Sequence, residues 1–332
     1  MPLKKIKFLF LFLLIQSLGL ISKSQTEKVK VPKNLSFEKN EKNFFPVTTF
    51  SGSTFFTLGA IDSKDVSKNN AVHSSYENKI KSKTSFTGKD FLLIEFESGN
   101  AINSPLNLDL QSKKGDTLKL STMFYKFQIN DELGAIVGPK MFGYHGLAGK
   151  STAYNERIAI LDGSNYTTSS GLGPSFGFFM KKKTGLNASM KVASNNSEMS
   201  SESTHFINQI GYTKKFFGGT ITSNLNDEFN AYGLSIYFKP IKSLSISSSI
   251  EQKDNFLSKK INNWIFALQK NDEFKNFGIA VGTHNEQEMI GYEAWSEIMI
   301  SDKIKLIPVF FIRENIERNR DLGFAINSKF SF

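Results

Sequence analysis

The sequence predicts an all-β protein: a transmembrane antiparallel β-barrel of about 16 strands that follow one another as an up-and-down meander. Three observations lead to this prediction. From Phe50 to Phe332, short segments alternate apolar and polar residues with a period of two. The links between them are alternately short and long. The chain begins with an export signal, yet its sequence shows no later apolar run suited to a transmembrane helix.

Residues 1–24 have the pattern of a signal peptide. Three lysines precede the apolar run Phe8–Leu20, and small residues follow it. We expect cleavage near Gln25 and export to the cell outer membrane. An uncleaved anchor is the alternative, although the apolar run is shorter than the ~20 residues of a spanning helix.

The composition narrows the classes of partner. The chain has no cysteine, which excludes a disulfide scaffold and thiolate metal sites. Its net charge of +10 falls to +6 without the four lysines of the signal peptide, and this modest, dispersed excess argues against a nucleic-acid partner. Residues 25–49 are polar and lysine-rich, and we expect a linker there.

We expect residues 50–332 to form the barrel domain. The expected strands are 50–60, 76–87, 90–98, 116–127, 133–142, 169–180, 185–194, 204–213, 217–224, 230–239, 242–250, 260–269, 274–283, 289–299, 303–313 and 321–332. In 242–250, Leu244, Ile246 and Ile250 share one face, and serines occupy the other. We expect the serine face to meet water.

The links decide between architectures. Tight links such as Gly88–Lys89 and Ser301–Asp302 follow the even-numbered strands, and longer polar links such as 99–115 and 143–168 follow most odd-numbered ones. Transmembrane barrels have short periplasmic turns and long extracellular loops in this arrangement. A β-sandwich is the alternative, but it gives no reason for segregated loop lengths.

The last segment alternates up to its final residue. Leu322, Phe324, Ile326, Phe330 and Phe332 share one face. A sheet crosses lipid only if it has no edge, so strand 321–332 should pair with strand 50–60. We also expect the aromatic residues Phe330 and Phe332 to be the signal that the barrel assembly machinery recognises.

Four stretches resemble the cyanobacterial branch of the OprB-like porins, a branch described as carbohydrate-selective or iron-uptake porins. They are "TSFTGKDFLLIEFESGN" (84–100), "LGAIVGPKMF" (133–142), "GYEAWSEIMISDKIKLIPVFFI" (291–312) and the terminal "KFSF". The resemblance covers roughly Phe50–Phe332 and implies a homotrimer of channels for small hydrophilic solutes. Members usually carry an S-layer-homology domain before the barrel, where this chain has only 25–49.

A barrel of this size has a water-filled lumen, so something must set its selectivity. The long link 143–168 is the candidate for a loop that narrows the pore; an ordinary exposed loop is the alternative. The candidate constriction residues are Tyr144, His145, Lys150, Tyr154, Glu156, Arg157 and Asp162.

Strand-borne charges should line the same lumen. By alternation, the lumen-facing charges are Lys79, Lys81, Lys83, Glu95, Glu97, Glu293, Glu297, Lys303, Lys305 and Arg313. Facing rows of opposite sign would create a transverse field that favours compact polar solutes. Because the lumen-facing charges include both signs, the ion preference stays open, with a slight preference for anions expected.

Three functions remain in view. The first is a porin for passive diffusion of sugars and inorganic ions across a membrane of outer-membrane lipid. The second is a structural or adhesive barrel with little conductance, and the third is a barrel enzyme. We expect no enzyme activity, cofactor or metal, because the four histidines lie far apart and no ligand spacing such as HExxH occurs.

Overall fold

The computed structural model describes residues 45–332, apart from 65–70, 103, 109–110, 113, 150–153, 156, 158–160, 162–164, 169–172, 196–203, 256–259, 273–274, 285–287, 315–316 and 318. The expected signal peptide, 1–24, and most of the expected linker, 25–49, lie outside these residues. The first strand begins at Val47, slightly before the expected start at Phe50.

Sixteen strands and one short helix make up the described part of the chain. The strands are β1 (Val47–Asp62), β2 (Val72–Ser85), β3 (Asp90–Gly99), β4 (Gly115–Gln128), β5 (Leu133–Met141), β6 (Gly173–Lys181), β7 (Leu186–Ser194), β8 (Thr204–Thr213), β9 (Phe217–Leu225), β10 (Phe229–Ile241), β11 (Leu244–Asn255), β12 (Ile261–Asn271), β13 (Lys275–His284), β14 (Met289–Ser301), β15 (Ile304–Glu314) and β16 (Arg320–Ser331). The helix α2 (Asn165–Thr168) lies between β5 and β6 and was not expected. Among the described residues, no helix is long and apolar enough to cross a membrane.

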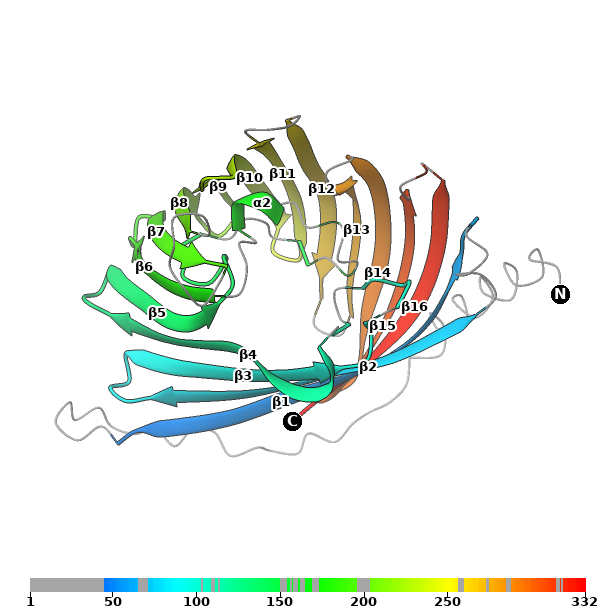
Figure 1. The fold of residues 1–332 in the computed structure, drawn as a ribbon, viewed down its shortest axis with the longest axis horizontal. Helices are drawn as coiled ribbons and strands as arrows, with labels where there is room; N and C mark the ends of the chain where they lie inside the picture. The colour runs from blue at the N-terminus through cyan, green and yellow to red at the C-terminus, as the bar shows by residue number, and fades with distance from the viewer. Residues whose placement is uncertain are drawn as a thin grey trace. The chain divides into compact units, whose positions relative to one another are not determined.

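Each strand pairs antiparallel with its neighbours in sequence, and β1 pairs with β16 to close a barrel (Figure 1). The predicted fold class, a closed antiparallel meander of sixteen strands, is confirmed. The closing pair runs from Ser53 opposite Ser331 to Asp62 opposite Leu322. Beyond it, the backbone N–H of Gly52 donates to the carbonyl oxygen of Phe332 at 2.9 Å, and the N–H of Phe332 donates back at 3.0 Å. The predicted pairing therefore extends to the last residue.

The two faces of the wall differ as the alternation predicts. On β10, Tyr232, Leu234 and Ile236 point outward and are 52%, 47% and 56% exposed, whereas Ala231 and Ser235 point inward and are buried. An outward apolar band is the surface that a transmembrane barrel presents to lipid.

A carboxylate organises the short link 86–89 between β2 and β3. The carboxylate of Asp90 accepts hydrogen bonds from the hydroxyl of Ser85 and from the backbone N–H groups of Phe86 and Thr87, each at 2.9 Å. Gly88 has a φ of 78°, in the left-handed region that favours glycine. These interactions fix a tight turn and with it the register of the two strands.

Apolar side chains also gather inside the barrel. The members of this apolar cluster are Ile61, Leu106, Leu108, Tyr154, Leu161, Ile265, Ala267, Ala280, Trp295, Ile307, Val309, Phe311 and Ala325. Most lie on inward-facing positions of β1 and β12–β16, and the rest come from the loops 100–114 and 142–172. One part of the inner wall is therefore covered by protein.

The inner face of β11 also departs from expectation. Ser245, Ser247 and Ser249 were expected to meet water, but they are 3%, 2% and 3% exposed. The helix α2 contacts β9, β10 and β11, and Figure 1 shows it on the inner side of these strands. Strand alternation cannot reveal a loop that folds over the wall.

Candidate functional site

The connection between β5 and β6, residues 142–172, folds into the barrel and is called the inward loop. Its described residues form hydrogen bonds with side chains from six strands, β7, β8, β9, β11, β12 and β14. The wall residues that hold it are Ser189, Lys191, Gln209, Asn224, Glu251, Gln269, Glu293 and Glu297. This set of contacts places the loop against the wall between β7 and β14.

Glu293 on β14 receives the middle of the inward loop. Its carboxylate accepts a hydrogen bond from the hydroxyl of Tyr154 at 2.5 Å and from the backbone N–H of Arg157 at 3.1 Å. The indole N–H of Trp295 donates to the same Tyr154 hydroxyl at 2.9 Å. Burial and the adjacent Glu293 carboxylate raise the pKa of Tyr154 far above its ordinary value, so the hydroxyl stays protonated and donates.

Glu297, two inward positions further along β14, forms the charged part of the site. The guanidinium of Arg157 lies 3.2 Å from one carboxylate oxygen, and the ammonium of Lys305 lies 2.6 Å from the other. The guanidinium also lies over the ring of Trp295, 4.6 Å from its centroid. The positive charge of Arg157 is thus largely balanced, although two cations share one carboxylate.

Lys191 on β7 fixes the start of the inward loop. Its ammonium donates to the carbonyl oxygens of Phe142, Gly143 and His145 at 2.6, 3.2 and 3.1 Å. An ammonium has three donors, and here all three are used by a single turn of backbone.

The next residues of the loop lie directly against β7–β9. The N–H of Ala148 donates to Ser189 at 3.2 Å, and the N–H of Gly149 donates to Gln209 at 2.7 Å. A Cβ added to Gly149 would lie 2.5 Å from a methyl carbon of Thr220. Only glycine fits this close approach to the wall.

Glu251 on β11 holds the helix α2. Its carboxylate accepts the backbone N–H groups of Tyr166 and Thr167 at 3.0 and 3.1 Å. The side-chain amide of Asn224 on β9 donates to the carbonyl oxygen of Tyr166 at 2.8 Å. A carboxylate from a distant strand therefore satisfies the first N–H groups of the helix, which have no intrahelical partner.

His145 packs into an aromatic group at the start of the inward loop. Its ring lies 4.9 Å from Phe124, 5.6 Å from Phe142 and 4.5 Å from Tyr144, and its Nδ1 accepts the N–H of Phe142 at 3.0 Å. Burial, reinforced by the positive charges of Lys191, Lys81 and Lys126, lowers the pKa of His145 to about 3. His145 is therefore neutral near pH 7.

A second loop, residues 100–114, also folds inward. Leu106 and Leu108 are fully buried in the apolar cluster. The guanidinium of Arg313 on β15 donates to the carbonyl oxygens of Pro105 and Leu106, the latter at 3.0 Å. Arg313, expected to line the lumen, therefore binds this loop, and its Nε lies 3.8 Å from the carboxylate of Asp321 on β16.

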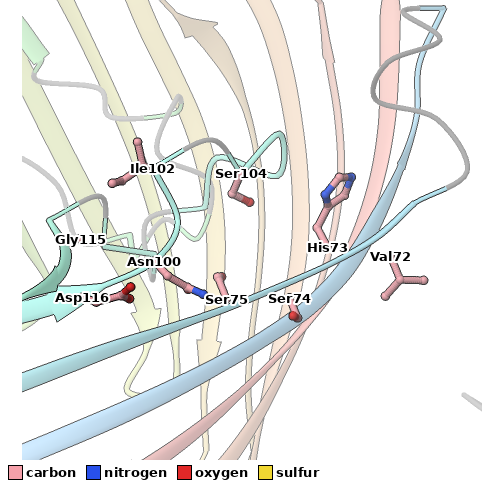
Figure 2. A pocket seen from close by; sticks show the side chains of 9 residues that line it. All are labelled: Val72, His73, Ser74, Ser75, Asn100, Ile102, Ser104, Gly115 and Asp116. Atoms are coloured by element: carbon pink, nitrogen blue, oxygen red, sulfur yellow. The ribbon is translucent and has the colours of Figure 1, made fainter.

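A pocket of about 460 Å³ opens between this second loop and β2 (Figure 2). Its lining residues are Val72, His73, Ser74, Ser75, Asn100, Ile102, Ser104, Gly115 and Asp116. Asp116 accepts the hydroxyl of Tyr76 at 2.6 Å, and Asn100 accepts the Tyr76 backbone N–H at 2.8 Å. The polar groups of the pocket thus join β2 to the loop and to the start of β4.

The remaining strand-borne charges occupy β2, β3 and the last turn. Lys79 lies 2.8 Å from Glu77, and Lys81 lies 2.7 Å from Glu95. Glu97 accepts the hydroxyl of Ser121 at 3.0 Å. Lys83 lies over the ring of Phe91, with its nitrogen 4.4 Å from the centroid. Lys303 lies in the exposed turn before β15, which starts at Ile304.

The other expected site residues divide into three groups. Lys150, Glu156 and Asp162 lie outside the described residues. Tyr144 is 54% exposed and stacks on Phe142, with the ring centroids 5.2 Å apart. Phe330 meets Phe56 edge-to-face on the outer surface at 5.8 Å, and Phe332 forms the terminal backbone pair described above.

Several inward-facing residues were missed from the sequence. Lys126 on β4 lies 4.3 Å from the centroid of Phe179, and Lys329 on β16 lies 5.2 Å from that of Phe55. A bulge shifts the register of β4 between Thr122 and Leu120, which reverses the alternation before Lys126. Lys329 shares the polar face of its strand, so alternation alone could have identified it, as it could the anchors Lys191 and Glu251.

Comparisons with known proteins support the fold. No family model and no curated protein matches the chain. Solved structures of an engineered porin from Rhodopseudomonas blastica do match. One variant aligns with a TM-score of 0.57 at 10% identity, and a triple mutant aligns with a TM-score of 0.57 at 9% identity. Both alignments cover 86% of this chain and 100% of that chain.

Fold and comparison together define the class of protein. The chain is a sixteen-stranded, porin-like β-barrel with a loop folded against its inner wall. At about 10% identity the likeness concerns the fold alone and assigns no family.

Proposed function

We propose that this chain is a porin of the cell outer membrane, a channel for passive diffusion of small hydrophilic solutes. The inward loop is the observation that supports this function best. Contacts to six strands hold it inside the barrel, so it can narrow a passage without closing the whole lumen. A barrel whose role was only structural or adhesive would not need a loop held in this way.

The outer surface supports the membrane location. Outward-facing aliphatic and aromatic side chains form the apolar band described above, which suits outer-membrane lipid. In this proposal a cleaved signal peptide, 1–24, exports the chain. The barrel assembly machinery then recognises the C-terminal strand that carries Phe330 and Phe332.

The outer face of β2 supports assembly into a homotrimer. Ser74, Asn78, Ser82 and Thr84 point outward on this strand, interspersed with Val72, Tyr76 and Ile80, whereas the outward face of β10 is almost wholly apolar. A polar strip is costly against lipid and is tolerated against another protein surface. A second copy of this chain is the partner that we propose for it, in line with the resemblance to trimeric OprB-like porins.

The constriction that we propose comprises the inward loop and the strand charges facing it. Tyr154 and Arg157 are fixed by Glu293 and Glu297, and Tyr144 and His145 are fixed by Lys191 and the aromatic group. Lys150, Glu156 and Asp162 belong to the same loop and complete the proposed set. Sugars and inorganic ions are the solutes that this proposal covers.

Recording from single molecules of purified protein in a planar lipid bilayer tests the function. Stepwise current increases are expected on insertion. The absence of any current from a folded, heat-resistant barrel would contradict the proposal and favour a structural or adhesive role. Hydrolysis of an ester or lipid substrate by such a silent barrel would instead indicate an enzyme.

A further inference from the structure

The described residues leave one part of the inner wall uncovered. The apolar cluster covers β12–β15 and the parts of β1 and β16 at Ile61 and Ala325, and the inward loop contacts strands from β7 to β14. On β2, by contrast, the inward-facing side chain of Lys81 is 46% exposed, and Lys83 is exposed as well. Since these side chains point into a closed barrel, their exposure marks water-accessible space along β2, beside the half-buried Lys126 of β4 and Lys329 of β16.

Lysines dominate this uncovered wall. Lys83 on β2, Lys126 on β4 and Lys329 on β16 point inward, and within the described part of the chain none lies in a salt bridge with a carboxylate. Their neighbours Lys81 and Lys305, in contrast, are paired with Glu95 and Glu297. Even with the Lys79–Glu77 pair and the carboxylate of Glu97 counted, the inward lysines outnumber the carboxylates, so the wall carries a net positive charge.

Each of the three unpaired ammonium groups lies over a phenylalanine ring. The distances from nitrogen to ring centroid are 4.4 Å for Lys83 over Phe91, 4.3 Å for Lys126 over Phe179 and 5.2 Å for Lys329 over Phe55. The face of an aromatic ring attracts a cation without neutralising its charge. The ring holds the long side chain at the wall and leaves its full charge available to a solute.

The lysines and the inward loop face the same space. The charges of Lys81, Lys126 and Lys191 act on His145 from β2, β4 and β7. Lys191 is buried and bonded to the loop, but Lys81 and Lys126 face the space between loop and wall that an ion would cross. Field lines concentrate in a narrow aqueous passage between low-dielectric walls, so a few unpaired charges there outweigh many at the surface.

We infer that the passage prefers small anions, with Lys83, Lys126 and Lys329 as a series of sites for carboxylates and inorganic oxyanions. This inference rests on the channel function proposed above. A sugar channel would need open aromatic faces for stacking. Phe55 and Phe179 are instead 4% and 3% exposed, under lysines. These rings bind the lysine ammonium groups and offer no open face to a sugar.

The reversal potential in a gradient of potassium chloride tests the inference. For the unmodified protein, the reversal potential should lie on the side of zero that indicates chloride preference. This result can be read without any variant. The triple substitution Lys83→Gln, Lys126→Gln and Lys329→Gln should move the reversal potential toward potassium. The difference should shrink at molar salt, where the Debye length is about 3 Å.

A matched control removes the same charge elsewhere. The control is the triple substitution Lys182→Gln, Lys214→Gln and Lys215→Gln, at three lysines in exposed turns. Two of them also lie over aromatic rings, Lys214 over Tyr212 and Lys215 over Phe216. This control should leave the reversal potential where it was.

The outcomes separate the two proposals. Cation preference in the unmodified protein, or equal shifts from both triple variants, would overturn the anion inference and leave the channel standing. A complete absence of conductance in the folded, unmodified protein would overturn both. If the lumen triple variant does not fold, Lys83→Gln alone, at an exposed position, should still give part of the shift, and no shift would count against the inference.

Discussion

The hydroxyl of Tyr154 donates a hydrogen bond of 2.5 Å to Glu293, 139 residues further along the chain. Tyr154 belongs to the inward loop, which connects β5 and β6. Glu293 belongs to β14, on the opposite side of the barrel. Because both are buried, the bond is made in a low dielectric and its loss is not compensated by water.

We expect Tyr154→Phe to loosen the inward loop while the barrel stays folded. The change removes one donor from the Glu293 carboxylate and deprives the indole N–H of Trp295 of its acceptor. Leaving such buried groups unsatisfied costs about 1–3 kcal/mol. Faster cleavage by trypsin after Arg157 would report the loosened loop. The control is Tyr144→Phe, at an exposed residue, which should leave the cleavage rate unchanged, and equal rates in both variants would contradict the prediction.

The free energy of unfolding should depend on pH because of His145. Its pKa is lowered from 6.5 to about 3 by burial and by Lys191, Lys81 and Lys126. Between these values the unfolded chain binds a proton that the folded chain does not. The free energy of unfolding should therefore fall as pH drops from about 6.5 toward about 3.

Unfolding midpoints of the protein in detergent, measured from pH 7 to pH 4, test this. His145→Asn is the matched variant, because its amide oxygen can still accept the Phe142 N–H and it cannot titrate. Its unfolding midpoint should fall less over this range. Parallel pH curves for the two proteins would show that His145 makes no contribution.

A lysine on the outer face should be far more harmful than one on the inner face. Ile236 is 56% exposed on the apolar band, near the middle of β10. A lysine at the bilayer midplane costs about 2–4 kcal/mol. Ser53→Lys adds the same charge at a half-buried, inward-facing position of β1. We expect Ile236→Lys to reduce the yield of folded barrel in lipid vesicles and Ser53→Lys to leave it nearly unchanged; the reverse order would mean that the faces are assigned wrongly.

The strands and the inner face of the wall were accessible from the sequence because a period of two is local information. The partners that the anchors of the inward loop hold were not. Glu293 was expected to face the lumen, yet nothing near it in sequence indicates Tyr154 as its partner. The same is true of Glu251 and Lys191, because each binds backbone groups of a segment that is distant in sequence. Such contacts depend on how the loop folds, which alternation does not encode.

The bulge in β4 shows a second limit. One extra residue reverses the two faces of a strand, so alternation continued from Leu118 and Leu120 would place Lys126 on the outer face rather than the inner one. The charges that support the anion inference were thus only partly recognisable in advance: Lys83 was expected, and Lys126 and Lys329 were not.

The closure of the barrel gives the last prediction. A Cβ on Gly52 would lie 2.3 Å from ring carbons of Phe332, so alanine cannot be accommodated while the ring keeps its place. We expect Gly52→Ala to displace the ring and strain the two terminal backbone hydrogen bonds, at a cost of about 1–3 kcal/mol. Unfolding in urea, followed by the shift in gel mobility of the barrel, measures this cost.

A double-mutant cycle supplies the control. Phe332→Ala removes the ring and keeps the backbone N–H and carbonyl that pair with Gly52. Gly52→Ala should therefore cost much less in the Phe332→Ala background than in the unmodified protein, because the ring no longer obstructs the added methyl group. Strict additivity of the two changes would mean that the ring does not lie over Gly52 in the membrane. If Phe332→Ala alone refolds normally from urea yet assembles slowly in cells, the ring acts as the assembly signal rather than as a support for closure.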